Sequence, residues 1–439
     1  FAPVLDINSN PRNPVIGYRS FGDNITNVAS AGLSYASGVE DAGVLAVAKH
    51  FPGHGDTDKD SHKTLPCLSH NKERMESFEM RPFEEFAKAG FGGLMVGHLE
   101  VPAIEPIQGM PSSASKKFIT GYIRNKFHFN GLVFTDGLAM EGARKYPDFC
   151  VKSLMAGVDI LLDPIPLADQ WKKLRTAVSN GILSQDDIDK KCRRVLIFKH
   201  ALNCGIMPDR SAIDTQNAQT LSKDLYQASL VLLKHEKPFN GNTIIEVQNA
   251  KSATIAQVNQ KCNASKKPIT LIFYTSPYNL AYYKDAIKKA SSVIAAHEDY
   301  SFAHEAVRNV LEGKANIDGQ LCVTIPGLFN TGDGLVINNI RETETTVNNP
   351  ADSIPQKPAI AEISNNALLE IDSIVNDGLQ KGAFPGCQVL VAKDGKIIYN
   401  KSFGWYDETR QKKVTNESIY DLASVSKAAA TLPALMIAI

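Results

Sequence analysis

Short apolar runs recur in the first 167 residues, and longer amphipathic stretches separate several of them. Strands that are apolar along their whole length, with helices between them, indicate a parallel sheet that is buried on both faces. This pattern constrains the chain to an α/β fold. The expected strands are Pro3–Ile7, Val44–Ala48, Gly93–Val96, Gly131–Thr135 and Gly157–Leu162, and helices are expected over 72–89 and 115–127.

Polar residues follow these runs, among them Lys49 and His50, His98 and Asp136. A (β/α)8 barrel places its chemistry at the carboxyl ends of its strands, and a doubly wound sheet binds ligands there too. The five expected strands are fewer than the eight of a barrel. We therefore expect a TIM-type barrel that lacks its N-terminal strands.

A second alternating unit is expected over about 211–336 and predicts a three-layer α/β domain. A stretch rich in Asn and Pro, 338–358, is typical of a linker. Ser184 is expected to cap a helix over 183–202. The other expected helices are 218–230, 282–290, 302–311 and 365–380, and the other expected strands are 230–233, 243–247, 269–273, 292–295, 386–392 and 396–399.

Composition excludes several classes of protein. The chain has 47 basic and 47 acidic residues, which argues against a nucleic-acid-binding protein because phosphate neutralisation needs a basic excess. No apolar run reaches the roughly 18 residues that a transmembrane helix needs. The seven cysteines form no CxxC pair, so we interpret them mostly as buried apolar residues rather than a disulfide framework or zinc site.

The densest polar cluster, Lys49–His62, directly follows a predicted strand and is rich in His, Asp and Gly. A solvated loop is one interpretation. A metal site is a second, but the spacing of His54, His62 and the aspartates matches no zinc or calcium pattern, and no metal is assigned. The third is acid/base chemistry, in which Asp60 orients His62 and raises its pKa, because i and i+2 on an extended loop point the same way.

Asp136 lies in a second cluster, Gly131–Gly142, just past the end of a predicted strand. A carboxylate at this position is either a catalytic group or the N-cap of the following helix. Both interpretations stay open from the residues alone.

Three segments resemble bacterial β-N-acetylglucosaminidases of glycoside hydrolase family 3. Lys49–His62 is similar to the family's KHFPGHGxTxxDSH signature, Phe134–Met140 to its nucleophile motif, and Phe1–Gly22 to the segment before the signature. The resemblance covers about residues 1–340. It implies a retaining exo-β-N-acetylglucosaminidase that acts on terminal β-linked GlcNAc, expected to come from peptidoglycan fragments, and no cofactor.

The resemblance also implies a role for each matching residue. Asp136 is the expected nucleophile, and His62, oriented by Asp60, is the expected general acid/base. The expected sugar-binding residues are Arg19, Lys49, His50, His98 and Met140. For His98, a hydrogen-bonded structural histidine is an equal alternative.

A third element, Ser424–Lys427, fits Ser-x-x-Lys, which places a hydroxyl beside an amine across one helical turn. With the preceding helix and hairpin it resembles the start of class C β-lactamase and penicillin-binding-protein-like serine hydrolases. That resemblance implies Ser424 as nucleophile and Lys427 as its base.

The expected domains are 1–205, a barrel incomplete at its beginning; 206–340, the α/β domain; 341–362, a linker; and 363–439, a serine-hydrolase domain incomplete at its end. We expect a periplasmic or cell-envelope location. The alternative functions are a β-glucosidase, a glycoside phosphorylase, or a non-catalytic sugar-binding protein. Because barrel strands are expected to be missing, both an active and an inactive chain stay open, whereas the incomplete serine-hydrolase domain is expected to be inactive.

Overall fold

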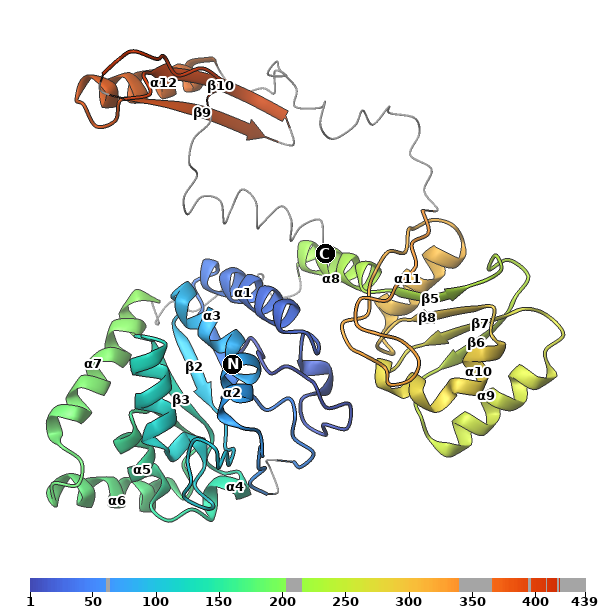
Figure 1. Ribbon diagram of the computed structural model, residues 1–439, viewed down its shortest axis with the longest axis horizontal. Coiled ribbons are helices and arrows are strands. Elements are labelled where there is room, and N and C mark those ends of the chain that lie inside the picture. Colours follow the sequence, from blue (N-terminus) through green and yellow to red (C-terminus); the bar gives the residue numbers. More distant parts are fainter. Residues whose placement is uncertain are drawn as a thin grey trace. The chain divides into compact units, whose positions relative to one another are not determined.

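The structure is a computed structural model that describes residues 1–60, 64–202, 215–338, 365–393, 396–407, 409–416 and 418. Two compact units are present, Phe1–Ile340 and Arg341–Ile439 (Figure 1). His62, Ser424, Lys427 and the predicted linker lie outside the described residues. Within the described residues, no helix combines the length and the apolar character that crossing a membrane requires.

The first sheet has four parallel strands that lie side by side in chain order. They are β1 (Val47–Phe51), β2 (Gly93–Val96), β3 (Leu132–Gly137) and β4 (Ile160–Leu162). Because all four strands run in one direction, their carboxyl ends meet at one edge of the sheet. The α/β fold is confirmed, and the completeness of a barrel stays a prediction.

The strand boundaries differ from expectation in a way that matters for the site. β1 begins three residues later than predicted and contains Lys49 and His50, so these polar residues lie inside the strand. Pro3–Ile7 forms one isolated parallel bridge, Val4 to Lys49, instead of a full strand. Pro3 has no N–H to donate, which limits the pairing of this segment.

Helices surround the first sheet (Figure 1). Their core is aromatic: the ring of Phe51 in β1 meets those of Phe83, Phe118 and Phe127 edge-on at 5.6, 6.2 and 5.9 Å. The helices are α1 (Ile25–Asp41), α2 (Lys72–Arg74), α3 (Arg81–Ala89), α4 (Glu141–Arg144), α5 (Phe149–Ala156), α6 (Leu167–Ser179) and α7 (Gln185–Ala201), with π-helical segments Met75–Glu79 and Lys117–Lys126 and 3₁₀ turns Gly17–Arg19 and Ser112–Ala114.

Two features of these helices were not expected. The predicted helix over 72–89 is interrupted by the π-helical segment Met75–Glu79. Helix α3 begins after it, at Arg81, one residue before Pro82. Helix α1 was not predicted because, apart from Val28, its buried face consists of Ala and Gly, which give a weak apolar pattern. Ser184 caps α7 as predicted and accepts a hydrogen bond from the Asp187 N–H.

The second sheet has the order β5-β8-β7-β6, and only β5 runs antiparallel to its neighbour. One face of this sheet packs on α9 and α10 and the other on α8 and α11, which makes three layers (Figure 1). The elements are α8 (Gln216–Ala228), β5 (Val231–His235), β6 (Thr243–Val247), α9 (Ser252–Ala264), β7 (Ile269–Phe273), a 3₁₀ segment Pro277–Tyr283, α10 (Lys284–Lys289), β8 (Ser292–Ala295) and α11 (Ser301–Leu311).

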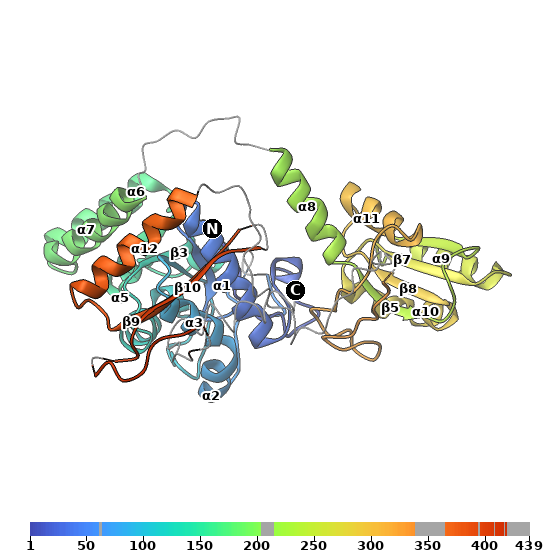
Figure 2. The same cartoon turned by 90° about the horizontal axis from the view of Figure 1, so that it is seen from above.

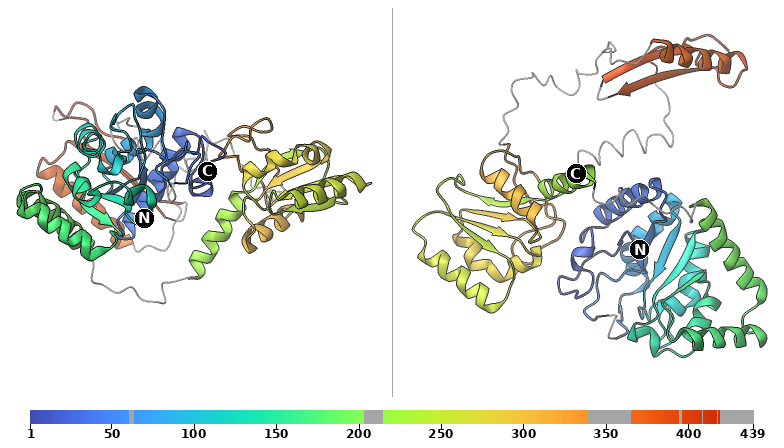
Figure 3. Two further views of the ribbon diagram at one scale, coloured as in Figure 1. Left: turned by 90° about the horizontal axis from the view of Figure 1, so that it is seen from below. Right: turned by 180° about the vertical axis from the view of Figure 1, so that it is seen from behind.

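The described part of the second unit is a helix and a hairpin: α12 (Asn365–Gln380), β9 (Gly386–Lys393) and β10 (Lys396–Gly404). Helix α12 lies along the hairpin (Figures 2 and 3). Asp372 of α12 accepts hydrogen bonds from the Tyr399 hydroxyl at 2.5 Å and the Lys401 ammonium at 2.7 Å in β10. These contacts fix the helix against one strand.

The prediction that the cysteines are mostly buried is wrong for the described residues. Among the described residues, Cys150 and Cys262 are buried, but Cys67 and Cys192 are exposed, and all six described cysteines are free thiols. Cys67 and Cys192 therefore do not serve as core residues.

Candidate active site

The site is organised by Asp6, a fully buried aspartate that sequence reasoning did not assign to it. Its carboxylate accepts three hydrogen bonds: from the His50 imidazole at Nδ1 (2.7 Å), the His50 N–H (3.1 Å) and the His54 N–H (2.7 Å). Burial raises the pKa of Asp6, but His50 and His54 outweigh burial and hold it below its usual value. Asp6 is thus an ionised anchor for the start of the motif.

His50 has a defined orientation because Asp6 holds one of its nitrogens. With the proton on Nδ1 bonded to Asp6, the lone pair of Nε2 faces the Arg19 guanidinium, whose Nη2 lies 3.2 Å away. Arg19 is exposed and ends the 3₁₀ turn Gly17–Arg19. The His50 ring therefore connects the buried, negatively charged Asp6 to the positively charged Arg19 at the surface through two hydrogen-bond contacts.

Two glycines of the motif are required by close packing. A Cβ on Gly55 would lie 1.7 Å from the Ile7 carbonyl oxygen, so only glycine fits there. Gly53 has φ +119°, and a Cβ would also lie 3.0 Å from the Cβ of Glu79. These contacts explain why the Pro52–Gly55 turn needs glycine at both positions.

His54 is buried and uncharged. Its Nδ1 lies 2.7 Å from the Thr57 hydroxyl, and burial lowers its pKa. It therefore shapes the turn between β1 and the loop that follows.

His98 follows β2, and both of its ring nitrogens have partners. Nε2–H donates to the Gly137 carbonyl at 3.1 Å, and Nδ1 accepts from the Ser113 hydroxyl at 2.7 Å. Burial lowers the pKa of His98, so the ring is neutral. This geometry is that of a hydrogen-bonded structural histidine. Its partner Gly137 is the neighbour of Asp136 in the chain.

Asp136 is the penultimate residue of β3, inside the strand. Its Oδ1 accepts the Gly137 N–H at 2.8 Å. Burial raises its pKa, but His50, His98, the hydrogen bond from the Gly137 N–H and His54 together outweigh burial, so the net pKa lies below the usual value and the group is a carboxylate. The capping interpretation is wrong, because α4 begins at Glu141 with Met140 in the N-cap position.

Lys49 and Met140 lie near this carboxylate. Lys49 is half-buried; burial and Arg19 lower its pKa, while Asp136 and Asp6 act in the opposite direction. Met140 adjoins Gly137, since a Cβ on that glycine would lie 3.7 Å from the methionine sulfur. The structure thus brings Asp136 together with Lys49, His50 and His98 at the carboxyl ends of β1–β3.

The predicted pair Asp60 and His62 is only partly described. Asp60 is half-buried, and its carbonyl accepts the N–H and the hydroxyl of Thr64 at 3.1 and 3.3 Å. A Cβ on Gly142 would lie 2.9 Å from the Thr64 carbonyl oxygen, so the end of this loop packs against α4. The loop therefore returns to the segment that follows Asp136.

Comparison with family models gives two matches. Residues 1–198 match the glycosyl hydrolase family 3 N-terminal domain, and residues 371–438 match the beta-lactamase family.

Curated relatives and solved structures agree with the first match. Beta-hexosaminidase A of Pseudoalteromonas piscicida is 31% identical over 329 residues, which is 68% of this chain and 55% of the relative. The structure of a glycoside hydrolase family 3 β-N-acetylglucosaminidase from a Paenibacillus species shares 26% identity and a TM-score of 0.64, covering 74% of this chain and 76% of that one. A beta-glucoside phosphorylase of 20% identity and TM-score 0.65, covering 75% of each chain, shares the fold.

The chain spans about half the length of the curated relatives it matches. A beta-hexosaminidase of Thioalkalivibrio sulfidiphilus is 37% identical over 165 residues, which is 46% of that relative and 37% of this chain. The parallel sheet, the cluster at its carboxyl edge and these similarities lead to one conclusion. Residues 1–198 are a glycoside hydrolase family 3 N-terminal domain, and the same chain carries beta-lactamase-family sequence at 371–438.

Proposed function

We propose that this protein is a retaining exo-β-N-acetylglucosaminidase that hydrolyses terminal β-linked GlcNAc. The observation that carries the proposal is the ionised Asp136 carboxylate at the end of β3, within the electrostatic reach of Lys49, His50 and His98. A nucleophile that attacks an anomeric carbon must be deprotonated, and the low pKa meets that need. Similarity to proteins named beta-hexosaminidase supports the choice of sugar.

The proposed reaction has two steps. Asp136 attacks the anomeric carbon while His62 gives a proton to the departing oxygen, which forms a glycosyl-enzyme ester and releases the aglycone. Water then attacks the same carbon, gives its proton to His62, and releases the sugar with retained configuration. Asp60 is assigned to orient His62.

The sugar-binding assignments follow from position. Lys49, near Asp136, and Arg19, beside His50, present polar hydrogens and are proposed to bind sugar hydroxyls together with His50, whose Nε2 lone pair accepts, while Met140 is proposed to line the site. His98 is assigned to hold Gly137, and thereby the end of β3, through its 3.1 Å hydrogen bond.

The test is hydrolysis of aryl β-GlcNAc and aryl β-glucoside by the full-length protein, with and without phosphate. Release of GlcNAc at a rate independent of phosphate supports the proposal. Formation of a sugar 1-phosphate would identify a phosphorylase, which is a specific alternative because a histidine acid/base carries no negative charge to repel phosphate. GlcNAc binding without turnover would identify a non-catalytic sugar-binding protein.

We also propose that the substrate comes from peptidoglycan, because the chain matches the beta-lactamase family at 371–438 and the penicillin-binding relatives of that family act on wall peptides. In that segment Ser424 is the proposed nucleophile and Lys427 its base. The proposed domains are 1–205, 206–340 and 363–439, joined by the linker 341–362. Release of GlcNAc from muropeptides by the full-length protein tests the substrate.

A further inference from the structure

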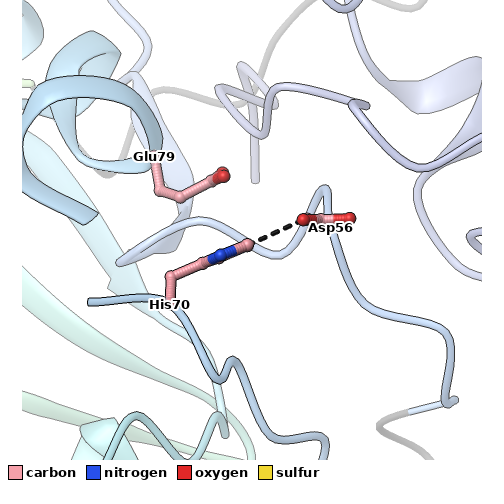
Figure 4. Close-up of side chains that lie close together, drawn as sticks. All are labelled: Asp56, His70 and Glu79. Carbon is pink, nitrogen blue, oxygen red and sulfur yellow. Dashed lines mark hydrogen bonds and ion pairs between the residues drawn. The ribbon is translucent and has the colours of Figure 1, made fainter. Parts of the chain in front are cut away.

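Three potential metal ligands gather beside the motif: Asp56, His70 and Glu79 (Figure 4). One ligand atom from each lies within 4.8 Å of the other two, and His70 Nε2 lies 2.7 Å from Asp56 Oδ2. Figure 4 shows the three side chains directed toward one another from a loop, an extended segment and the end of a helical turn. Among the described residues, no other group of three or more His, Cys, Asp and Glu side chains has this geometry.

Glu79 is a second, independent sign of a ligand. Its side chain is 0% exposed, and its Oε2 has no hydrogen-bond partner. Only Oε1 is paired, with Arg74 Nη2 at 3.0 Å. A buried carboxylate oxygen without a partner is unfavourable, so such an atom calls for a cation or a proton.

The donor set selects a class of ion. One imidazole nitrogen and two carboxylate oxygens suit Zn²⁺, Mn²⁺ or Fe²⁺ better than Ca²⁺ or Mg²⁺, which prefer oxygen alone. Two carboxylates balance the charge of a divalent ion. The side chains of Asp56 and His70 are 26% and 29% exposed, which leaves one side open to water as a fourth ligand.

We propose that Asp56, His70 and Glu79 bind a divalent transition-metal ion at a site distinct from Asp136. Asp56 precedes Asp60 by four residues, and His70 follows the same loop. Gly53 packs directly on Glu79, so the ion would join the loop to the π-helical segment Met75–Glu79. The proposal is independent of the proposed hydrolase activity, since Asp136 belongs to neither the ligand set nor the test.

The experiment is a Zn²⁺ titration of the chelator-treated full-length protein, followed by calorimetry and metal analysis. The wild type is expected to bind one equivalent at this site. Glu79→Gln and His70→Gln are each expected to weaken that equivalent by about 100-fold or more. Asp56→Asn, at a partly exposed position, serves if Glu79→Gln does not fold.

His304→Gln is the matched control. His304 and Asp299 form a pair with the same 2.7 Å separation, and His304 is exposed to about the same degree as His70, but Asp299 is more exposed than Asp56 and no buried carboxylate belongs to the pair. It is expected to bind Zn²⁺ as the wild type does. Absence of binding by the wild type, or equal binding by all four variants, would overturn the proposal.

Co²⁺ gives a readout that does not depend on affinity. The bound ion is expected to show visible d–d absorption in the wild type and to lose it in His70→Gln. The spectrum is also expected to persist when GlcNAc is added in excess. Displacement of the ion by the sugar would place it in the sugar site and contradict the proposal.

Discussion

The two sheets of the first unit share an α/β layering but differ in what they bury. Among the described residues, every buried carboxylate lies within residues 1–202, which contain the first sheet: Asp6, Glu79, Glu105 and Asp159. The buried polar side chains of residues 215–338 are hydroxyls: Thr270, Thr275, Ser291 and Ser292. A buried charge is expensive unless it is paired, so a fold retains one only where something compensates for it.

The same contrast holds at matched positions. Asp136 and Glu246 are the penultimate residues of the parallel strands β3 and β6. Asp136 is partly buried among imidazoles, whereas Glu246 is exposed. The layers are therefore a scaffold that either sheet provides, and the chemistry depends on which polar groups the strand ends bring together.

The largest expected effect comes from Asp136→Asn. Removing the proposed nucleophile is expected to lower hydrolysis of aryl β-GlcNAc by the full-length protein by about 10³-fold or more. Glu246→Gln, the matched change in the second sheet, is expected to leave the rate unchanged. Steady-state kinetics of the two variants checks this, and an active Asp136→Asn would remove the proposed distinction between the sheets.

Glu79 provides a pH-dependent comparison. Burial raises its pKa to about 7, from 4.5, so its contribution to stability is complete below pH 4.5 and is lost as the pH rises through 7. In metal-free protein this loss is about 3 kcal/mol. Chemical unfolding between pH 5 and 8 measures it.

Glu79→Gln is expected to flatten that pH dependence, and Zn²⁺ is expected to abolish it in the wild type, because the ion stabilises the carboxylate. Glu298→Gln, a change at an exposed carboxylate near the second sheet, should leave the profile as it is. A wild-type profile that is already flat in the presence of chelator would contradict the burial argument.

Asp6→Asn tests how the first sheet orients its histidines. A hydrogen bond to a charged group contributes roughly 1.5–3 kcal/mol. If Asp6 holds His50 in its sugar-binding tautomer, kcat/KM should fall by about 10–100-fold. The lowered pKa of Asp6 stabilises the fold above about pH 4, and this contribution is lost as the pH falls through the folded-state pKa. An unchanged kcat/KM would show that the Asp6–His50 contact is structural only.

The smallest expected effect is that of Arg19→Ala. Arg19 is exposed and touches His50 through one 3.2 Å contact, so we expect a rise in KM of about tenfold or less. Arg308→Ala, at an exposed position on α11, should not change KM. Equal effects of the two variants would mean that Arg19 does not bind the sugar.

The apolar patterning was enough to predict the strands near Gly93–Val96, Ile269–Phe273 and Ser292–Ala295, because burial on both faces leaves a continuous apolar run. It misplaced both ends of β1. The end was missed because the polar His50 lies buried inside the strand, where its ring nitrogen is bonded to Asp6. The residues of one motif do not show that a distant carboxylate will pair with a buried histidine.

Some residues of the candidate site could be predicted from the sequence, and others could not. Asp136, Lys49, His50 and His98 could be selected from strand-end positions, and the structure brings them together. Asp6 lies inside the first expected strand, Pro3–Ile7, and nothing in the sequence showed that it pairs with a residue 44 positions later. The burial of Glu79 was even harder to predict from the sequence, because a carboxylate on a helix is ordinarily exposed.

The proposed reaction requires Asp136 to form a covalent glycosyl-enzyme. The most direct measurement is mass spectrometry of peptides from full-length protein treated with a slow fluorinated GlcNAc donor. We expect one sugar mass on the peptide that contains Asp136, and none in Asp136→Asn. A sugar attached to another residue, or a first-formed product with inverted anomeric configuration, would contradict the claim.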